Sequence, residues 1–245
     1  MRVEIISCLQ DNYSYLIIDD KNNIACVVDP SEAKPIIEFV KKNKINLKYI
    51  LNTHHHYDHI GGNKELKELY NVTVVGYKND AHRIPEIDIL VEDNQIWKAL
   101  NFEAKVFHIP GHTSGHICFY FFNENFIFTG DTLFSLGCGR IFEGTYEEMF
   151  ASLNKIKNLP EHTTIYCGHE YTLQHSQFCI KHDPNNIRLK NKIVEIKKKI
   201  KKNIPTVPSI LKYDINYNIF LKAKDIDTFS KLIDYKDNFY LIILD

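Results

Sequence analysis

Four histidines and one aspartate crowd into a single short segment, THHHYDH at residues 53–59. A predicted buried strand ends just before this segment, and residues 60–63 begin a predicted helix. Alternate residues of an extended segment point the same way, so His54 and His56 can bind one ion together. Asp58 and His59 follow where the chain turns, and they can bind a second ion. Such a density of polar side chains predicts a metal site, because unpaired polar groups at a strand end are costly to bury.

Three later predicted strands also lead into ligand-type side chains. His112 follows the strand predicted at residues 105–109, Asp131 follows the strand at 126–129, and His169 follows the strand at 163–168. A glycine stands beside each of these turns. Because glycine permits tight turns and close backbone approach, several strand ends can bring their side chains toward one point.

The combination H-x-H-x-D-H, followed by a histidine, an aspartate and a histidine in that order, resembles the metallo-β-lactamase superfamily. The resemblance implies an α+β fold, a four-layer αββα sandwich with two metal ions at one edge. It also implies a ligand set of seven side chains, of which one bridges both ions. The implied ligands are His54, His56 and His112 for the first ion, Asp58, His59 and His169 for the second, and Asp131 as the bridge.

Five imidazoles and two carboxylates suit Zn²⁺ or Fe²⁺ better than Mg²⁺ or Ca²⁺, which prefer oxygen ligands. We expect two divalent ions per chain, zinc first, with iron or manganese as alternatives. Two ions roughly 3.5–4 Å apart can share a water, lower its pKa and supply a bridging hydroxide. Asp58 could also orient that hydroxide. The expected chemistry is hydrolysis, and no Ser-His-Asp or Cys-His nucleophile is required.

Further segments resemble the glyoxalase II, or hydroxyacylglutathione hydrolase, family within that superfamily. They lie at residues 11–16, 28–30, 53–63, 130–134, 137–145, 168–172 and 206–209. The resemblance implies a thiolesterase that splits S-2-hydroxyacyl glutathione, typically S-lactoylglutathione, into glutathione and a 2-hydroxy acid such as lactate. This reaction is the second step of methylglyoxal detoxification. The same resemblance implies a catalytic domain at residues 1–169 and a smaller, mostly helical substrate-binding domain at residues 170–245.

Glutathione carries carboxylates at both ends, so its binding site should be cationic and partly aromatic. The resemblance assigns this role to Arg140, Phe142 and Tyr171, with Phe142 where the family often has tyrosine. Residues 218–224 resemble the family's N-P-F-L-R segment, but lysine replaces its arginine. Lys222 or Lys224 is therefore expected to anchor the glycine carboxylate without bidentate geometry. Alternatively, each lysine is a charged side chain that is exposed to solvent at a helix end and has no role in substrate binding.

Three other polar residues belong to the motifs without being implied ligands. His55 and His116 are out of phase with the ligand positions, so they are expected to support ligands rather than bind metal. Asp29, at the end of a predicted strand, could play the same part or simply form a turn.

Two other functions remain open from the sequence. A mononuclear iron dioxygenase acting on glutathione persulfide belongs to the same superfamily, but it would leave Asp58 and His169 without a role. A metal-bound scaffold without turnover is the second alternative, and the intact ligand set argues against it. The number of bound metal ions separates the first alternative from the hydrolase.

The elements that must position these side chains follow from hydrophobic periodicity. Helices are predicted at residues 31–43, capped by Ser31, around residues 66–70, and at 145–159, where residues 145–148 form a capping box. Residues 171–203 are predicted to be helical. This order predicts two sheets with helices packed outside. Strands are expected at residues 2–7, 13–19, 24–29, 49–53, 72–77, 105–109, 117–122, 126–129 and 163–168.

The composition is that of a globular protein, with 245 residues, 44% hydrophobic and 25% charged. A formal net charge of −1 provides no field for holding nucleic acid or an acidic membrane surface. The apolar runs fall far short of the roughly 20 residues of a spanning helix, and no signal or transit segment is recognisable. Six scattered cysteines predict reduced, buried thiols. We therefore expect a cytoplasmic monomer without nucleic-acid or membrane partners.

Overall fold

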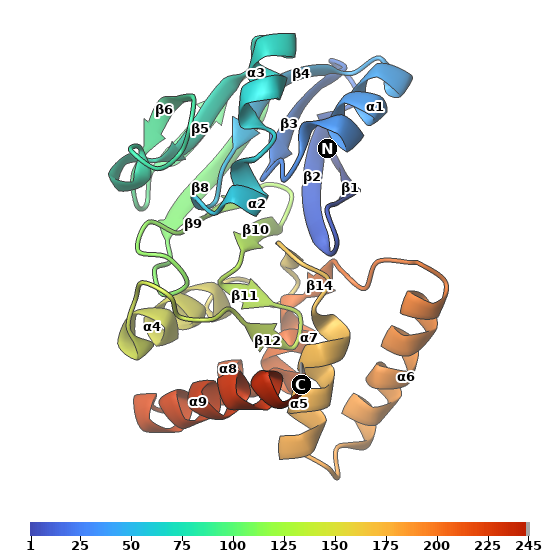
Figure 1. Cartoon of the computed structure of the whole chain (residues 1–245), viewed down its shortest axis with the longest axis vertical. Helices are drawn as coiled ribbons and strands as arrows, with labels where there is room; N and C mark the ends of the chain where they lie inside the picture. Colours follow the sequence, from blue (N-terminus) through green and yellow to red (C-terminus); the bar gives the residue numbers. More distant parts are fainter. Residues whose placement is uncertain (244–245) are drawn as a thin grey trace. The chain divides into compact units, whose positions relative to one another are not determined.

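The computed structural model describes residues 1–243 and divides the chain into two compact units (Figure 1). The first unit comprises Met1–His108 and Gly115–Gly130. The second unit comprises Ile109–Ser114 and the chain from Asp131 onward.

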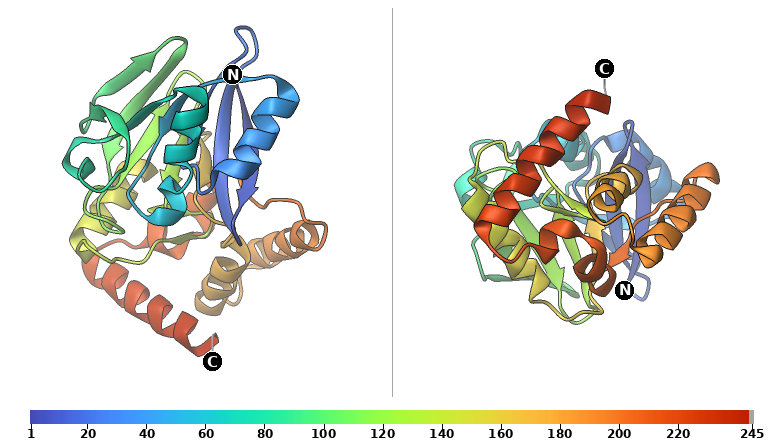
Figure 2. Two further views of the ribbon diagram at one scale, coloured as in Figure 1. Left: turned by 45° about the horizontal axis from the view of Figure 1, so that its top comes forward. Right: turned by 90° about the horizontal axis from the view of Figure 1, so that it is seen from below.

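The first unit contains a six-stranded sheet in the order β1-β2-β3-β4-β5-β6. β1, β2 and β3 pair antiparallel, and β3 to β6 pair parallel, so β3, β4 and β5 end at the same edge. Helices α1 and α3 pack on one face of this sheet (Figure 2). The bounds are β1 (Arg2–Cys8), β2 (Asn12–Asp19), β3 (Ile24–Val28), α1 (Ala33–Asn43), β4 (Asn46–Leu51), α3 (Asn63–Tyr70), β5 (Thr73–Tyr77) and β6 (Ile87–Val91).

Four antiparallel strands complete the first unit, in the order β7-β8-β9-β10. Aromatic side chains join them to the six-stranded sheet. The Tyr15 and Phe128 ring centroids are 5.4 Å apart, as are those of Tyr49 and Trp97. The first unit thus has the two facing sheets that were predicted, with α1 and α3 outside the six-stranded one. The remaining bounds are α2 (Tyr57–Ile60), the 3₁₀ turn η1 (Lys78–Asp80), β7 (Ile96–Ala99), β8 (Phe102–His108), β9 (Ile117–Phe121) and β10 (Phe126–Gly130).

The second unit is mostly helical and holds two short antiparallel pairs, β11 with β12 and β13 with β14. α4 packs against α8 and α9, and α5 packs against α6. The rings of Phe178, Phe220 and Phe229 form part of its core. The bounds are β11 (Leu133–Phe134), β12 (Gly137–Cys138), α4 (Tyr146–Lys157), β13 (Thr164–Cys167), α5 (Thr172–His182), α6 (Ile187–Lys201), β14 (Ser209–Ile210), α7 (Leu211–Tyr217), α8 (Ile219–Lys222) and α9 (Ile226–Ile243).

Several predicted element boundaries are wrong. β4 ends at Leu51 because the Thr53 N–H donates to the Asp29 carboxylate at 2.7 Å instead of pairing with a neighbouring strand. α1 begins at Ala33 after Glu32, so Ser31 is not its cap. The predicted helical stretch 171–203 is two helices, and the side chain of Asn186 caps the second by accepting from the Leu189 N–H at 2.9 Å. β6 and β7 were not predicted.

Other expectations are confirmed. The capping box at Thr145 and Glu148 is present, and α4 runs from it to Lys157. All six cysteines are buried and free. Among the described residues, no helix is both long enough and apolar enough to cross a membrane.

Candidate metal centre

The histidine-rich segment of the first unit leaves the sheet where β4 ends. His54 is fully buried and His56 is partly buried. Their nearest ring nitrogens, His54 Nε2 and His56 Nδ1, lie 3.1 Å apart. Two nitrogens that bind one tetrahedral zinc ion at its usual bond lengths are about 3.3 Å apart. The two side chains therefore have the spacing that a shared ion requires.

Asp29 fixes the neighbouring imidazole of His59. Its Oδ2 lies 3.0 Å from His59 Nδ1, and the same carboxylate accepts from the N–H and the hydroxyl of Thr53 at 2.7 and 2.6 Å. Asp29, His54 and His59 also offer ligand atoms that all lie within 4.8 Å of one another. Because Thr53 and His59 already occupy the Asp29 oxygens, we assign Asp29 to positioning and not to metal binding.

The hydrogen-bond partners of His54 and His59 favour one tautomer of each imidazole. The Thr53 hydroxyl donates to Asp29, so it can accept a hydrogen bond from His54 Nδ1, which lies 3.0 Å away. His59 Nδ1 donates to Asp29. Both rings then present Nε2 as an electron-pair donor, which is the form that binds a metal ion.

Asp58 lies beside His59 at the start of α2. Its Oδ2 is 3.6 Å from His59 Nε2 and accepts a hydrogen bond from Asn12 Nδ2 at 3.0 Å. Asn12 also donates to the Asp58 carbonyl at 3.0 Å. A carboxylate and an imidazole are thus held side by side at the end of the motif.

The remaining two histidines of these first-unit motifs make different contacts. His55 turns away, and its Nδ1 lies 3.2 Å from Asp80 Oδ2. The His116 ring stacks on His54 with centroids 4.5 Å apart. Gly130 makes this packing possible, because its φ is +47° and a side chain there would collide with His116 and Thr53.

The second unit brings together His112, Asp131 and His169. Asp131 Oδ2 lies 3.5 Å from His112 Nε2 and 3.2 Å from His169 Nε2, and all three side chains are buried. His112 Nδ1 donates to the Arg140 carbonyl at 2.9 Å, which again leaves Nε2 as the electron-pair donor. One carboxylate between two imidazoles is the arrangement expected of a carboxylate that bridges two metal ions.

The expected substrate-binding residues all lie in the second unit. Tyr171 stacks on His169 with centroids 4.7 Å apart and rings within 6° of parallel. Phe142 is 62% exposed, and its ring centroid lies 5.2 Å from that of the His112 ring. The Arg140 side chain is 42% exposed. Lys222 lies 3.9 Å from Asp183, and Lys224 is exposed.

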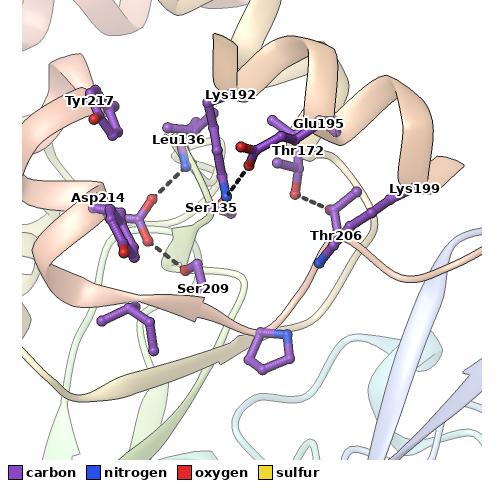
Figure 3. Close-up of a pocket in the computed structure, with 14 residues that line it drawn as sticks. Ser135, Leu136, Thr172, Lys192, Glu195, Lys199, Thr206, Ser209, Asp214 and Tyr217 are labelled. Carbon is purple, nitrogen blue, oxygen red and sulfur yellow. Dashed lines mark hydrogen bonds and ion pairs between the residues drawn. The ribbon is translucent and has the colours of Figure 1, made fainter. Parts of the chain in front are cut away.

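Sequence reasoning missed two buried groups that hold the loop between Asp131 and Arg140. Asp214 of α7 accepts from the Leu136 N–H at 2.8 Å and from the Ser209 hydroxyl at 2.5 Å (Figure 3). It borders a cavity of about 110 Å³ in the second unit. Burial raises the pKa of Asp214 to about 6. Lys236 of α9 is the other buried group, and no motif marks either residue in the sequence.

Comparison with known protein families shows to which superfamily the chain belongs. Residues 10–169 match the model of the metallo-β-lactamase superfamily, and residues 170–239 match the model of the hydroxyacylglutathione hydrolase C-terminus. The α+β fold with its helical C-terminal region is the metallo-β-lactamase fold, as predicted. The chain is a member of this superfamily.

Within that superfamily the chain belongs to the hydroxyacylglutathione hydrolase family. It is 66% identical to a hydroxyacylglutathione hydrolase of Pelagibacter ubique, over 98% of this chain and 100% of the relative. Among solved structures, ETHE1 from Myxococcus xanthus has a TM-score of 0.73 at 21% identity, covering 96% of this chain and 90% of that one. TTHA1623 in a di-iron-bound form has a TM-score of 0.58 at 25% identity, covering 69% and 92%.

Proposed function

We propose that this chain is a thiolesterase that hydrolyses S-2-hydroxyacyl glutathione, S-lactoylglutathione in particular, to glutathione and a 2-hydroxy acid. In methylglyoxal detoxification this is the second step. The observation that carries the proposal is 66% identity over 98% of the chain to a relative named hydroxyacylglutathione hydrolase. The histidine and aspartate groups of the two units support it, because they are the donors that metal-assisted hydrolysis needs.

Seven side chains hold two divalent ions in this proposal, three for each ion and one shared. They are His54, His56 and His112 for the first ion, Asp58, His59 and His169 for the second, and Asp131 for both. The imidazole-rich donor set suits zinc, with iron or manganese as alternatives. When bound, the ions would lower the pKa of a shared water and stabilise the negative charge that develops on the thioester carbonyl oxygen.

The chain's own groups prepare this chemistry. Asp29, Thr53 and the Arg140 carbonyl hold protons on the Nδ1 atoms of three histidines and keep their Nε2 atoms available. In this proposal the Asp58 carboxylate, to which Asn12 donates a hydrogen bond, would also orient the attacking water. The departing thiolate is a good leaving group, so no further acid is needed.

Substrate recognition rests on charge and on aromatic surface. Arg140 and one of Lys222 and Lys224 bind the glutathione carboxylates, while Phe142 and Tyr171 contact its backbone and the acyl group. The exposure of Arg140, Lys222 and Lys224 supports this assignment, because each charged group is accessible to a ligand.

We further propose a catalytic domain at residues 1–169 and a helical substrate-binding domain at residues 170–245. The family models, which meet between residues 169 and 170, support this division. We expect a cytoplasmic monomer that has no nucleic-acid or membrane partner. Light scattering of the purified protein tests whether it is a monomer in solution.

The decisive experiment follows thiol release from S-lactoylglutathione by purified protein whose metal content has been measured. Wild-type protein should turn over with about two metal ions per chain. His54→Ala and Asp131→Ala should each lower kcat/KM at least about 100-fold, because each removes a metal ligand. His82→Ala, which changes an exposed histidine outside the motifs, is the matched control and should retain activity.

The alternative outcomes are distinct. No turnover by wild-type protein with two bound metal ions would refute the thiolesterase proposal. One bound iron, with oxygen consumed on glutathione persulfide, would replace it with a dioxygenase.

A further inference from the structure

The second unit contains a cavity of about 110 Å³ that is bordered by α6, α7 and β14 (Figure 3). One buried water needs roughly 10–15 Å³ of such space, so the cavity has room for a small organic molecule. Its deeper part is lined by buried polar side chains, and its outer part is lined by charged side chains of α6. The former include Thr172, Thr206 and Asp214, and the latter are Lys192, Glu195 and Lys199.

One side of the cavity carries a buried carboxylate that has no ion-pair partner. Asp214 is 1% exposed and accepts hydrogen bonds from the Leu136 N–H and the Ser209 hydroxyl. Among the described residues, no basic nitrogen lies within ion-pair distance of its oxygens. Burial of this charge is costly, and it raises the pKa of Asp214 to about 6. A carboxylate can accept about four hydrogen bonds, so Asp214 can still bind a cationic donor.

The other side of the cavity carries a cation that also lacks an ion-pair partner. Lys199 lies across the cavity from Asp214 (Figure 3). No carboxylate of the described chain lies within ion-pair distance of the Lys199 ammonium group. The two remaining charges neutralise each other, because Lys192 Nζ lies 3.2 Å from Glu195 Oε2. The cavity therefore presents one unpaired negative charge and one unpaired positive charge to an occupant.

We propose that this cavity is a binding site for a small amino acid in its zwitterionic form. The ammonium group of the ligand lies at Asp214 and its carboxylate lies at Lys199, so each end makes a charge-assisted hydrogen bond. A simple anion would be repelled by Asp214, and a simple cation would be repelled by Lys199. Binding at this site does not require thiolesterase activity, because no lining residue is a proposed metal ligand or glutathione contact.

The cavity also touches the segment that carries His169 and Tyr171. The hydroxyl oxygens of Thr206 and Thr172 are 2.6 Å apart, and the Thr206 N–H donates to Glu170 Oε2 at 2.7 Å. Glu170 and Thr172 stand on either side of Tyr171 in the sequence. An occupant that contacts Thr172 and Thr206 should therefore change the environment of this segment, and its main-chain amides can report binding.

The test compares three probes of similar size and different charge. β-Alanine is a zwitterion, 3-hydroxypropionate is an anion and β-alaninamide is a cation. Each is titrated into the purified full chain at a pH well above the pKa of Asp214, and NMR shifts of the main-chain amides are followed. We expect a Kd of about 1 mM for β-alanine, in the range open to so small a ligand. The other two should bind at least about tenfold more weakly, because each leaves one charge unpaired.

Variants of the two unpaired charges show where the probe binds. Lys199→Met removes the ammonium group and Asp214→Asn removes the negative charge, and each should raise the Kd for β-alanine about tenfold. Lys199→Arg retains a cation and should bind nearly as well as wild type. Lys201→Met is the matched control, because Lys201 is an exposed lysine of the same helix. If Asp214→Asn does not fold, the Lys199 variants still decide, because Lys199 is exposed.

Three results would overturn the inference. The first is the absence of a saturable shift with β-alanine. The second is an equal affinity for 3-hydroxypropionate or for β-alaninamide, which would show that a single charge is sufficient. The third is a Kd for β-alanine that Lys199→Met does not change, which would place the ligand elsewhere, for example at the proposed metal ions. Shifts that are largest at Leu136, Thr172 and Thr206 and weaken in Lys199→Met would support the site.

Discussion

At the scale of single residues, Asp29 illustrates how one carboxylate can order several neighbours. It is 2% exposed and sits at a positive φ of 46°, a conformation in which aspartate is more common than most residues. From there it accepts from the Thr53 main chain, the Thr53 hydroxyl and the His59 ring. The sequence left Asp29 open as either a support or a turn former, and the contacts assign it to support.

Replacing Asp29 with alanine should therefore weaken metal binding without removing a ligand. We expect Asp29→Ala to lower metal affinity about 10–100-fold, because the His59 tautomer and orientation are no longer fixed. Competition with a chromogenic chelator measures this affinity. Asp88→Ala, at a partly exposed carboxylate of β6, serves as the control. An affinity equal to that of the wild type would show that Asp29 only shapes the turn.

Asp214 gives a pH-dependent prediction. Burial raises its pKa to about 6, although hydrogen bonds from Ser209 and Leu136 oppose the rise. A carboxyl whose pKa is higher in the folded state than in the unfolded state stabilises the folded protein. This contribution is fully present when the pH is below the unfolded-state pKa of 3.8, and it is lost as the pH rises through about 6.

Asp214→Asn removes the titration while keeping a hydrogen-bond acceptor. The free energy of unfolding of this variant should match that of wild type near pH 4. It should exceed wild type by up to about 3 kcal/mol at pH 8, since one pKa unit corresponds to about 1.4 kcal/mol. Urea unfolding across this pH range measures the difference. A difference that stays constant with pH would contradict the assignment.

At the scale of elements, the sequence predicted the boundary of a helix or strand correctly where the contacts that set this boundary join residues close in sequence. The capping box of α4 joins Thr145 to Glu148, three residues away, so the helix start can be read from the sequence. The end of β4 depends on Asp29, which lies 24 residues before Thr53. No local pattern could predict that boundary.

The cap of α4 has a measurable energy. Thr145→Ala should lower the free energy of unfolding by about 1 kcal/mol, because the Glu148 N–H loses its acceptor. Thr145→Ser keeps the acceptor and should behave like wild type in thermal unfolding. A fully stable alanine variant would mean that the packing of α4 against α8 and α9 alone sets the helix start.

At the scale of the whole molecule, the proposed ligands come from both units, with four from the first and three from the second. Ligand side chains separated by up to 115 residues, from His54 to His169, would be gathered only in the folded chain. Metal binding should therefore favour the folded state over the unfolded state.

Chelation should reveal this linkage. Removing the metal ions should lower the unfolding temperature by about 10 °C, because saturated binding contributes a few kcal/mol to stability. Differential scanning fluorimetry with and without chelator measures the shift, and added zinc should reverse it. His54→Ala should respond less to chelator. An unfolding temperature that does not change in the wild type would exclude tight metal binding.

The sequence by itself determined the family of this protein and the reaction expected of it. The types and order of seven side chains, together with the family segments around them, were sufficient for the superfamily, the family and the expected reaction, because these features are encoded locally in short motifs. The tertiary structure decided which groups hold His59 and the loop between Asp131 and Arg140. The hydrogen bonds that join Asp29 to His59, Asp214 to Leu136 and Lys236 to Cys138 link residues that are 30, 78 and 98 positions apart in the sequence. Such contacts have no local signature, since each depends on how distant elements pack and on which polar groups this packing buries.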